Sequence, residues 1–272
     1  MKNNLTVIIP VHKCNEDVNN LLLESVRSVG EMPILISTTP DLVSDLFNMM
    51  HDNGFGDQVT VISDSASETI NNDFCSLVNY GVSHVNTEWF SILEFDDVYR
   101  SNWWDNIDKY IEYMPSCSVF LPLTELKDFR NMSFIGYGNE APWATSFSNE
   151  VGYIDNDCLQ EYFDFYLTGG VYNTKDWKNV GGLKSSIKLT FWYEFLLRLT
   201  NQNKKVYVIP KLGYTHYLNR PNSIYEVYNN TIDEKEGNWW YELARQEYFF
   251  KEDRNKTYTP NINDDDNNGD NI

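Results

Sequence analysis

Hydrophobic and polar positions along the first hundred residues predict four strands separated by three helices. Apolar runs of strand length occupy positions 5–11, 32–37, 59–63 and 89–95. Apolar residues recur at helical spacing in the segments between them, 16–29, 41–50 and 73–85. A strand and helix series of this kind predicts an α/β fold, in which helices cover both faces of a mainly parallel sheet and ligands bind at the carboxyl ends of the strands.

The pattern is less regular after residue 100. It predicts strands at 117–122, 205–210 and 212–215 and a helix at 190–201 with one apolar face. An aromatic helix is expected at 234–252 and should pack back on the domain. Residues 124–166 are rich in polar and aromatic side chains without a clear period, which is typical of ligand-binding loops.

Composition narrows the class of protein. The chain has 272 residues, of which 42% are hydrophobic, and this is enough for one large domain or two small ones. The net charge of -19 argues against a broad electrostatic grip on nucleic acid, although modified DNA stays open as a substrate. No apolar run is long enough to span a membrane, and no signal-peptide pattern opens the chain, so we expect a cytoplasmic protein. The four widely spaced cysteines are expected to be reduced thiols.

The strand at 89–95 leads into three carboxylates, Glu94, Asp96 and Asp97. Like charges crowded at the end of a buried strand repel one another, so a positive partner is expected there, and oxygen ligands suit Mg²⁺ or Mn²⁺. The alternative is that Asp96 and Asp97 begin the following helix. No glycine-rich phosphate loop follows the first strand, and a metal could neutralise a diphosphate in its place.

Three stretches together resemble one enzyme family: Val7 to His12, Asn79 to Val82, and Phe90 to Asp97. They are similar to the amino-terminal half of family-2 glycosyltransferases of the GT-A fold, a Rossmann-like glycosyltransferase fold. The resemblance continues with Gly181-Gly182-Leu183, an acidic residue before Leu197-Arg198-Leu199, and the strand at 205–210. The asparagine-rich composition also resembles virus-encoded members, which would act in the host cytoplasm.

The resemblance implies transfer of a sugar from a nucleotide-sugar donor to a glycan or another hydroxyl-bearing acceptor, with inversion and with Mn²⁺ or Mg²⁺ as cofactor. It implies Asp96, Asp97 and His216 as metal ligands. For the donor it implies Pro10, His12, Asn79, Glu94 and Arg220, of which Arg220 also suits phosphate by its guanidinium chemistry. His216 could instead be a structural hydrogen-bonding residue.

The proton acceptor implied by the resemblance is Glu194, with Asp155 and the neighbouring Asp157 as rivals. Glu194 could instead form only a surface ion pair with Arg198, four residues later on the same helix. Two positions depart from the family pattern. Glu94 stands where the family has Asp, and Ser37-Thr38-Thr39 stand where an Asp usually reads the nucleobase, so the base of the donor stays open.

The expected organisation is a donor-binding half at 1–100, an acceptor-binding and catalytic half at 101–220, a helical segment at 221–252 and an acidic, disordered tail at 253–272. Two other functions compete with this interpretation. One is a catalytically inactive GT-A protein that binds glycans. The other is a nucleotidyltransferase, which would ordinarily carry a glycine-rich loop with basic residues that this chain lacks.

Overall fold

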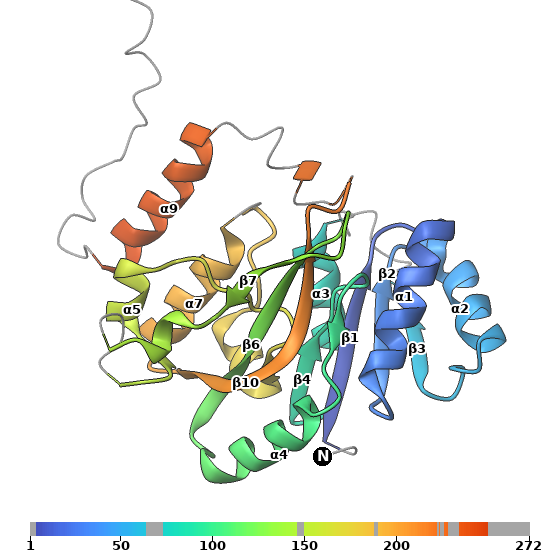
Figure 1. The fold of residues 1–272 in the computed structure, drawn as a ribbon, viewed down its shortest axis with the longest axis horizontal. Coiled ribbons are helices and arrows are strands. Elements are labelled where there is room, and N and C mark those ends of the chain that lie inside the picture. The colour runs from blue at the N-terminus through green and yellow to red at the C-terminus, as the bar shows by residue number, and fades with distance from the viewer. Residues whose placement is uncertain are drawn as a thin grey trace, which may run out of the picture.

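The computed structural model describes residues 4–63, 73–145, 150–187, 190–221, 223, 226–227 and 234–249. In these ranges the strands of the chain form a single sheet, with helices packed against it (Figure 1). The predicted tail at 253–272 lies outside the described residues.

The predicted alternation in the first hundred residues is confirmed. The elements are β1 (Leu5–Val11), α1 (Glu16–Val29), β2 (Ile34–Thr38), η1 (Pro40–Leu42), α2 (Val43–Asp52), β3 (Val59–Ile62), α3 (Phe74–Ser83) and β4 (Trp89–Ile92). The pairs β1–β2, β2–β3 and β1–β4 are all parallel. Side chains along β1 alternate between two cores: Val7 and Ile9 pack with α1 and α2, whereas Ile8 packs with α3.

The second half contains more regular structure than its sequence pattern predicts. Its elements are β5 (Val98–Tyr99), α4 (Trp103–Tyr113), β6 (Cys117–Asp128), β7 (Phe134–Gly138), η2 (Ala141–Trp143), β8 (Tyr153–Ile154), α5 (Asn156–Glu161), β9 (Val171–Asn173), α6 (Thr174–Val180), α7 (Phe191–Asn201), β10 (Lys205–Leu218) and α9 (Glu234–Tyr248). The predicted loops at 124–166 therefore include the end of β6, paired with β7 as a hairpin. The two strands predicted at 205–215 form one strand, β10, which pairs with β6 through register shifts near Leu212.

The order of the strands is β3-β2-β1-β4-β9-β6-β10-β5, with β7 beside β6 and β8 beside β10. Strand β9 connects the two halves of this sheet. It is antiparallel both to β4, where Trp89 pairs with Asn173, and to β6, where Val119 pairs with Tyr172. Because β9 reverses direction between them, β6 and its parallel neighbour β10 run in the same direction as β1 to β4. The carboxyl ends of these strands consequently lie along one edge of the sheet.

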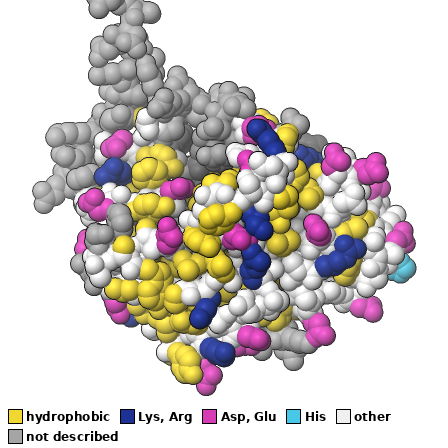
Figure 2. Space-filling view, in the orientation of Figure 1, with side chains coloured by type: hydrophobic (Ala, Val, Ile, Leu, Met, Phe, Trp, Pro, Cys, Tyr) yellow, Lys and Arg dark blue, Asp and Glu magenta, His cyan; other side chains and the backbone are white. Residues whose placement is uncertain are grey.

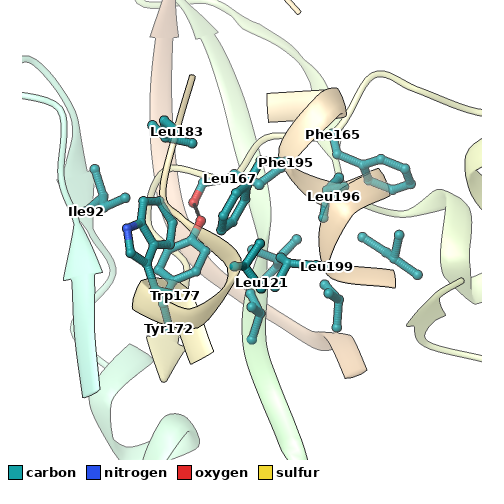
Figure 3. Packing of buried hydrophobic residues seen from close by; sticks show 14 of the residues in the cluster. Ile92, Leu121, Phe165, Leu167, Tyr172, Trp177, Leu183, Phe195, Leu196 and Leu199 are labelled. Atoms are coloured by element: carbon teal, nitrogen blue, oxygen red, sulfur yellow. Dashed lines mark hydrogen bonds between the residues drawn. The ribbon is translucent and has the colours of Figure 1, made fainter. Parts of the chain in front are cut away.

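An aromatic cluster holds β9 and α6 against α7 (Figure 3). The rings of Tyr172 and Trp177 lie 5.1 Å apart, and those of Trp177 and Phe195 lie 4.3 Å apart. The hydroxyl of Tyr172 donates to the carbonyl of Leu167, drawn as the dashed line in Figure 3. These contacts fix the segment that precedes β9, in which Gly169 donates to the carbonyl of Ile92 at the end of β4 and lies against Tyr214 of β10.

The surface is mixed in character. In Figure 2 the Lys and Arg side chains are interspersed with acidic and uncharged ones, and hydrophobic side chains gather at the lower left, over the start of β10 and the end of α4. Helix α9 contacts α7, and the ring centroids of Tyr241 and Tyr193 lie 5.5 Å apart. Within the described ranges, none of the helices combines the length and the apolar character needed to cross a bilayer. All four cysteines are free thiols, as predicted.

Candidate active site at the carboxyl edge of the sheet

Six of the predicted site residues meet at the carboxyl edge of the sheet. They come from the ends of three strands, β1, β4 and β10, and are His12, Glu94, Asp96, Asp97, His216 and Arg220. The alternative for Asp96 and Asp97 as the start of a helix is wrong, because β5 follows them and α4 begins only at Trp103. Both side chains are almost completely buried, with exposed fractions of 8% for Asp96 and 0% for Asp97.

Asp97 is held from both sides. Its Oδ2 lies 2.6 Å from Nδ1 of His216, and its Oδ1 accepts a hydrogen bond of 2.9 Å from the backbone N–H of Tyr217. Burial by itself would lower the pKa of His216, but the charge and hydrogen bond of Asp97, followed by the charges of Glu94 and Asp96, raise it to about 10. The imidazole is therefore protonated at neutral pH and neutralises Asp97.

Asp96 forms an ion pair with the guanidinium of Arg220, which is itself only 8% exposed. The Arg220 guanidinium lies 4.8 Å from the ring centroid of Phe95, and the ring centroids of His12 and Phe95 lie 5.4 Å apart. Burial and the charges of Lys13 and Arg220 lower the pKa of His12 to about 4, so its imidazole is neutral at pH 7. Arg220 is thus oriented by a carboxylate and an aromatic face, an arrangement suited to phosphate.

Glu94 is the third carboxylate of the cluster. Burial raises its pKa to about 7, and the charge of Asp97 adds to this effect, while His216, Arg220 and a hydrogen bond with Thr168 oppose it. A carboxyl group with such a pKa changes its protonation state near neutrality, so an arriving cation would readily displace its proton.

The donor set fits a hard divalent cation. One ligand atom each from Glu94, Asp97 and His216 lies within 4.8 Å of the others, and the Asp96 carboxylate is adjacent in sequence. An arriving cation would displace the proton of His216, and carboxylate oxygens with the freed imidazole nitrogen suit Mn²⁺, whereas Mg²⁺ prefers oxygen ligands. The same residues could therefore hold such an ion.

Two further residues predicted to bind the donor have structural contacts in the chain. Pro10 is buried within β1 and pairs with Ser37 of β2, which places it at the same edge. Asn79 is occupied by the backbone of Leu183: its Nδ2 donates to the Leu183 carbonyl at 2.7 Å, and its Oδ1 accepts from the Leu183 N–H at 2.9 Å. Asn79 therefore secures the glycine turn before α7, and these bonds occupy its amide.

Glu194 lies in a buried charge cluster. Its exposed fraction is 2%, and it accepts from Arg198 at 2.7 and 2.9 Å, from Lys184 at 2.8 Å and from the hydroxyl of Tyr248 at 3.1 Å. Burial opposes ionisation, but the hydrogen bonds from Arg198 and Lys184 lower its pKa. The predicted pair with Arg198 exists, but it is buried and not on the surface. A carboxylate with this many donors is a weak proton acceptor.

Asp155 is separated from the other site residues. It caps α5, accepting from the N–H of Cys158 at 2.7 Å. The preceding residue, Ile154, pairs with Val206 near the start of β10, ten positions before His216. At the rise of an extended strand this separation is roughly 30 Å. The exposed Asp157 belongs to the same short helix. The structure thus does not bring either carboxylate to Asp96 and Asp97.

Sequence reasoning missed the residues that position the carboxylates. The fully buried Ser25 of α1 donates from its hydroxyl to the carbonyl of Asp97 at 2.7 Å. The backbone N–H of Glu94 donates to the hydroxyl of Tyr214 at 3.2 Å, and Thr168 bonds the Glu94 side chain. These residues lie far from the carboxylates in sequence, so no local pattern connects them. The one sequence signal was Ser25, a polar residue among the apolar positions of α1.

Comparison with known proteins gives matches only at the level of structure. No protein-family model and no curated protein matches this sequence. TarS from S. aureus (residues 1–349) in complex with UDP-GlcNAc superposes with a TM-score of 0.61 and 12% identity, over 90% of this chain and 67% of that chain. The mannosyltransferase PcManGT from Pyrobaculum calidifontis, in complex with GDP-Man and Mn²⁺, gives 0.60 and 10%, over 96% of this chain and 66% of that chain.

A longer TarS structure gives a TM-score of 0.56 at 14% identity, and this chain, 92% of which is covered, spans only 44% of it. These neighbours are GT-A glycosyltransferases, and the likeness confirms the predicted GT-A fold. At such low identity it establishes the architecture, and the chemistry must be argued from the residues of this chain.

Proposed function

We propose that this protein is a metal-dependent glycosyltransferase, which moves a sugar from a nucleotide-sugar donor to a hydroxyl group of an acceptor. The observation that carries the proposal is the cluster of Glu94, Asp96, Asp97 and His216, facing Arg220 at the carboxyl edge of a GT-A sheet. Two proteins of the same fold support it by their ligands, since PcManGT is complexed with GDP-Man and Mn²⁺ and TarS with UDP-GlcNAc.

Each residue has a proposed role. Glu94, Asp97 and His216 would hold Mn²⁺ or Mg²⁺, with Asp96 beside them. When bound, the ion supplies positive charge that stabilises the departing diphosphate. Arg220, oriented by Asp96 and Phe95, would bind a phosphate oxygen of the donor. The neutral His12, which also lies against Phe95, would line the phosphate site. Inversion, membership of family 2 and a virus-encoded origin rest on the sequence resemblance.

A second candidate is a GT-A protein that binds a sugar ligand without transferring it. The engagement of Glu194 by Arg198, Lys184 and Tyr248 favours this alternative, because a general base needs a lone pair directed at the acceptor hydroxyl. The role of Glu194 as proton acceptor, with Asp155 as its rival, stays a prediction from the sequence.

The test is a panel of UDP-, GDP-, CDP- and dTDP-sugars, each measured by thermal denaturation with Mn²⁺ and with EDTA. The glycosyltransferase proposal predicts that at least one donor raises the melting temperature only with metal, since a ligand of the folded state stabilises it. It also predicts slow release of nucleoside diphosphate from that donor. Binding of a donor without release of nucleoside diphosphate, even with a range of acceptors, would favour the second candidate. If no donor raised the melting temperature, the proposal that this chain binds a nucleotide sugar would be overturned.

A further inference from the structure

One face of the β10–β6–β7 sheet continues directly from His216. In register, His216 pairs with Leu126 of β6, and Leu126 pairs with Gly136 of β7. Paired residues on neighbouring strands point to the same face, so this row extends outward from the carboxylate cluster. Two strand spacings, about 10 Å, separate His216 from Gly136.

Tyr166 stands on the same face and is rigidly mounted. The fully buried Asn139 accepts from the Tyr166 N–H at 2.9 Å, and its Nδ2 donates to the carbonyls of Tyr166 at 2.7 Å and of Pro122 at 2.9 Å. A Cβ at Gly138 would lie 2.5 Å from the Tyr166 ring, so this ring occupies the place of a side chain at 138. The Tyr166 ring is half-buried and lies 5.5 Å from that of His216.

Gly136 leaves the adjoining position open. Among the residues that the structure describes, a Cβ there would meet nothing within 4 Å, and its backbone needs no positive φ. An apolar side chain, Leu126, lies in the same row between Gly136 and His216. The face therefore offers an open place bounded by an aromatic ring, an aliphatic side chain and the hydrogen-bonding groups at the carboxylate cluster.

We propose that Tyr166 and the open position at Gly136 form a subsite for a pyranose ring of the acceptor, which makes the acceptor a carbohydrate. A pyranose presents apolar C–H groups on one face and hydroxyls around its edge, which matches an aromatic ring beside polar groups. The subsite is assigned to the acceptor and not to the donor, because the proposed phosphate contacts, His12 and Arg220, both lie against Phe95, whereas Tyr166 lies against His216 and Gly138. This inference rests on the proposed function for the identity of the second substrate.

The test uses an array of immobilised oligosaccharides with pyranose ends, probed with the full chain in Mn²⁺ and a nucleoside diphosphate. The wild-type protein should retain at least one oligosaccharide. Tyr166→Leu should weaken the apparent affinity about tenfold, because stacking is lost, whereas Tyr166→Phe should keep most of it. Gly136→Val, whose added methyl groups enter the open position, should weaken it at least as much.

Matched controls are Tyr113→Leu at an exposed tyrosine of α4 and Ile135→Val at the exposed neighbour of Gly136, both of which should bind like wild type. Wild-type binding by both Tyr166→Leu and Gly136→Val, or no bound oligosaccharide for the wild-type protein, would overturn the subsite. The nucleotide-sugar melting panel separates the two proposals. If no donor stabilises the chain while the variants still lose oligosaccharide binding, the subsite stands and the transferase proposal fails. If a donor stabilises the chain while the variants bind oligosaccharide like wild type, the transferase proposal stands and the subsite fails.

Discussion

Nδ1 of His216 lies 2.6 Å from Oδ2 of Asp97, although 119 positions separate the two residues in the chain. The pair connects the end of β10 to the turn after β4, and the neighbouring Tyr217 N–H completes the environment of the carboxylate. Because the pair is buried, each partner depends on the other for compensation of its charge.

Asp97→Asn should lower the pKa of His216 from about 10 toward or below its ordinary value of 6.5, because burial then acts with less opposition. A raised pKa in the folded state means that the pair stabilises the fold fully below pH 6.5 and loses this effect as the pH rises through about 10. NMR titration of the imidazole in metal-free protein measures the shift. An unaltered titration would show that other groups hold the proton.

Asp96→Asn should abolish the metal-dependent stabilisation by a nucleoside diphosphate and with it sugar transfer, because an amide is a poorer ligand and no longer neutralises Arg220. Titration calorimetry with Mn²⁺ and nucleotide measures the loss. The exposed Asp105→Asn on α4 makes the same chemical change outside the cluster and should bind normally. Normal binding and turnover in Asp96→Asn would contradict the site.

Glu194→Ala should lower the free energy of unfolding by about 3–5 kcal/mol, because Arg198 and Lys184 lose a buried partner. A surface pair would account for only about 0.5 kcal/mol. Glu194→Gln tests the proton-acceptor role, since a base would lose turnover on the order of a hundredfold while donor affinity is kept.

The stability difference between wild type and Glu194→Gln should depend on pH. The pKa of Glu194 is lowered in the folded state, so its contribution is present above the ordinary value of 4.5 and is lost as the pH falls below it. Urea denaturation at a series of pH values from 7 to 3 should therefore show the two proteins converging in acid. A constant difference would mean that the charge of Glu194 contributes little.

Asn79→Ala should destabilise the fold by about 1–3 kcal/mol, because the buried amide and carbonyl of Leu183 lose their partners. Gly182→Ala should act in the same direction, since a Cβ would lie 2.4 Å from Oδ1 of Asn79 and the glycine has a φ of +66°. The melting temperature of each variant measures the destabilisation, and the nucleotide affinity of Asn79→Ala tests whether Asn79 also contacts the donor. A large loss of affinity in folded Asn79→Ala would restore the predicted donor contact.

Asp155→Ala should lower stability by about 1 kcal/mol through loss of the α5 cap and leave turnover unaltered. Asn156→Ala is a suitable neighbour for comparison, since its side chain accepts from Thr200 and has no capping bond. A collapse of turnover in Asp155→Ala alone would place the proton acceptor at this helix.

The sequence by itself determined the first half of the fold and the location of the acidic cluster. Continuous apolar runs such as Leu5–Val11 identify strands buried on both faces, and the helical spacing between them requires parallel pairing. A carboxylate that follows such a strand must then lie at the carboxyl edge, so the position of Asp96 and Asp97 could be predicted without coordinates.

Only the tertiary structure decided what each polar residue contacts. The three-residue β9 is too short to predict, yet it sets the direction of β6 and β10 and thereby brings His216 and Arg220 to Asp97 and Asp96. The spacing of Glu194 and Arg198 predicted their ion pair, but not the further bonds that Glu194 accepts from Lys184 and from Tyr248 of α9. Local periodicity reports which face of an element is apolar, whereas charge compensation depends on groups that are distant in sequence, and no local pattern encodes which of these meet.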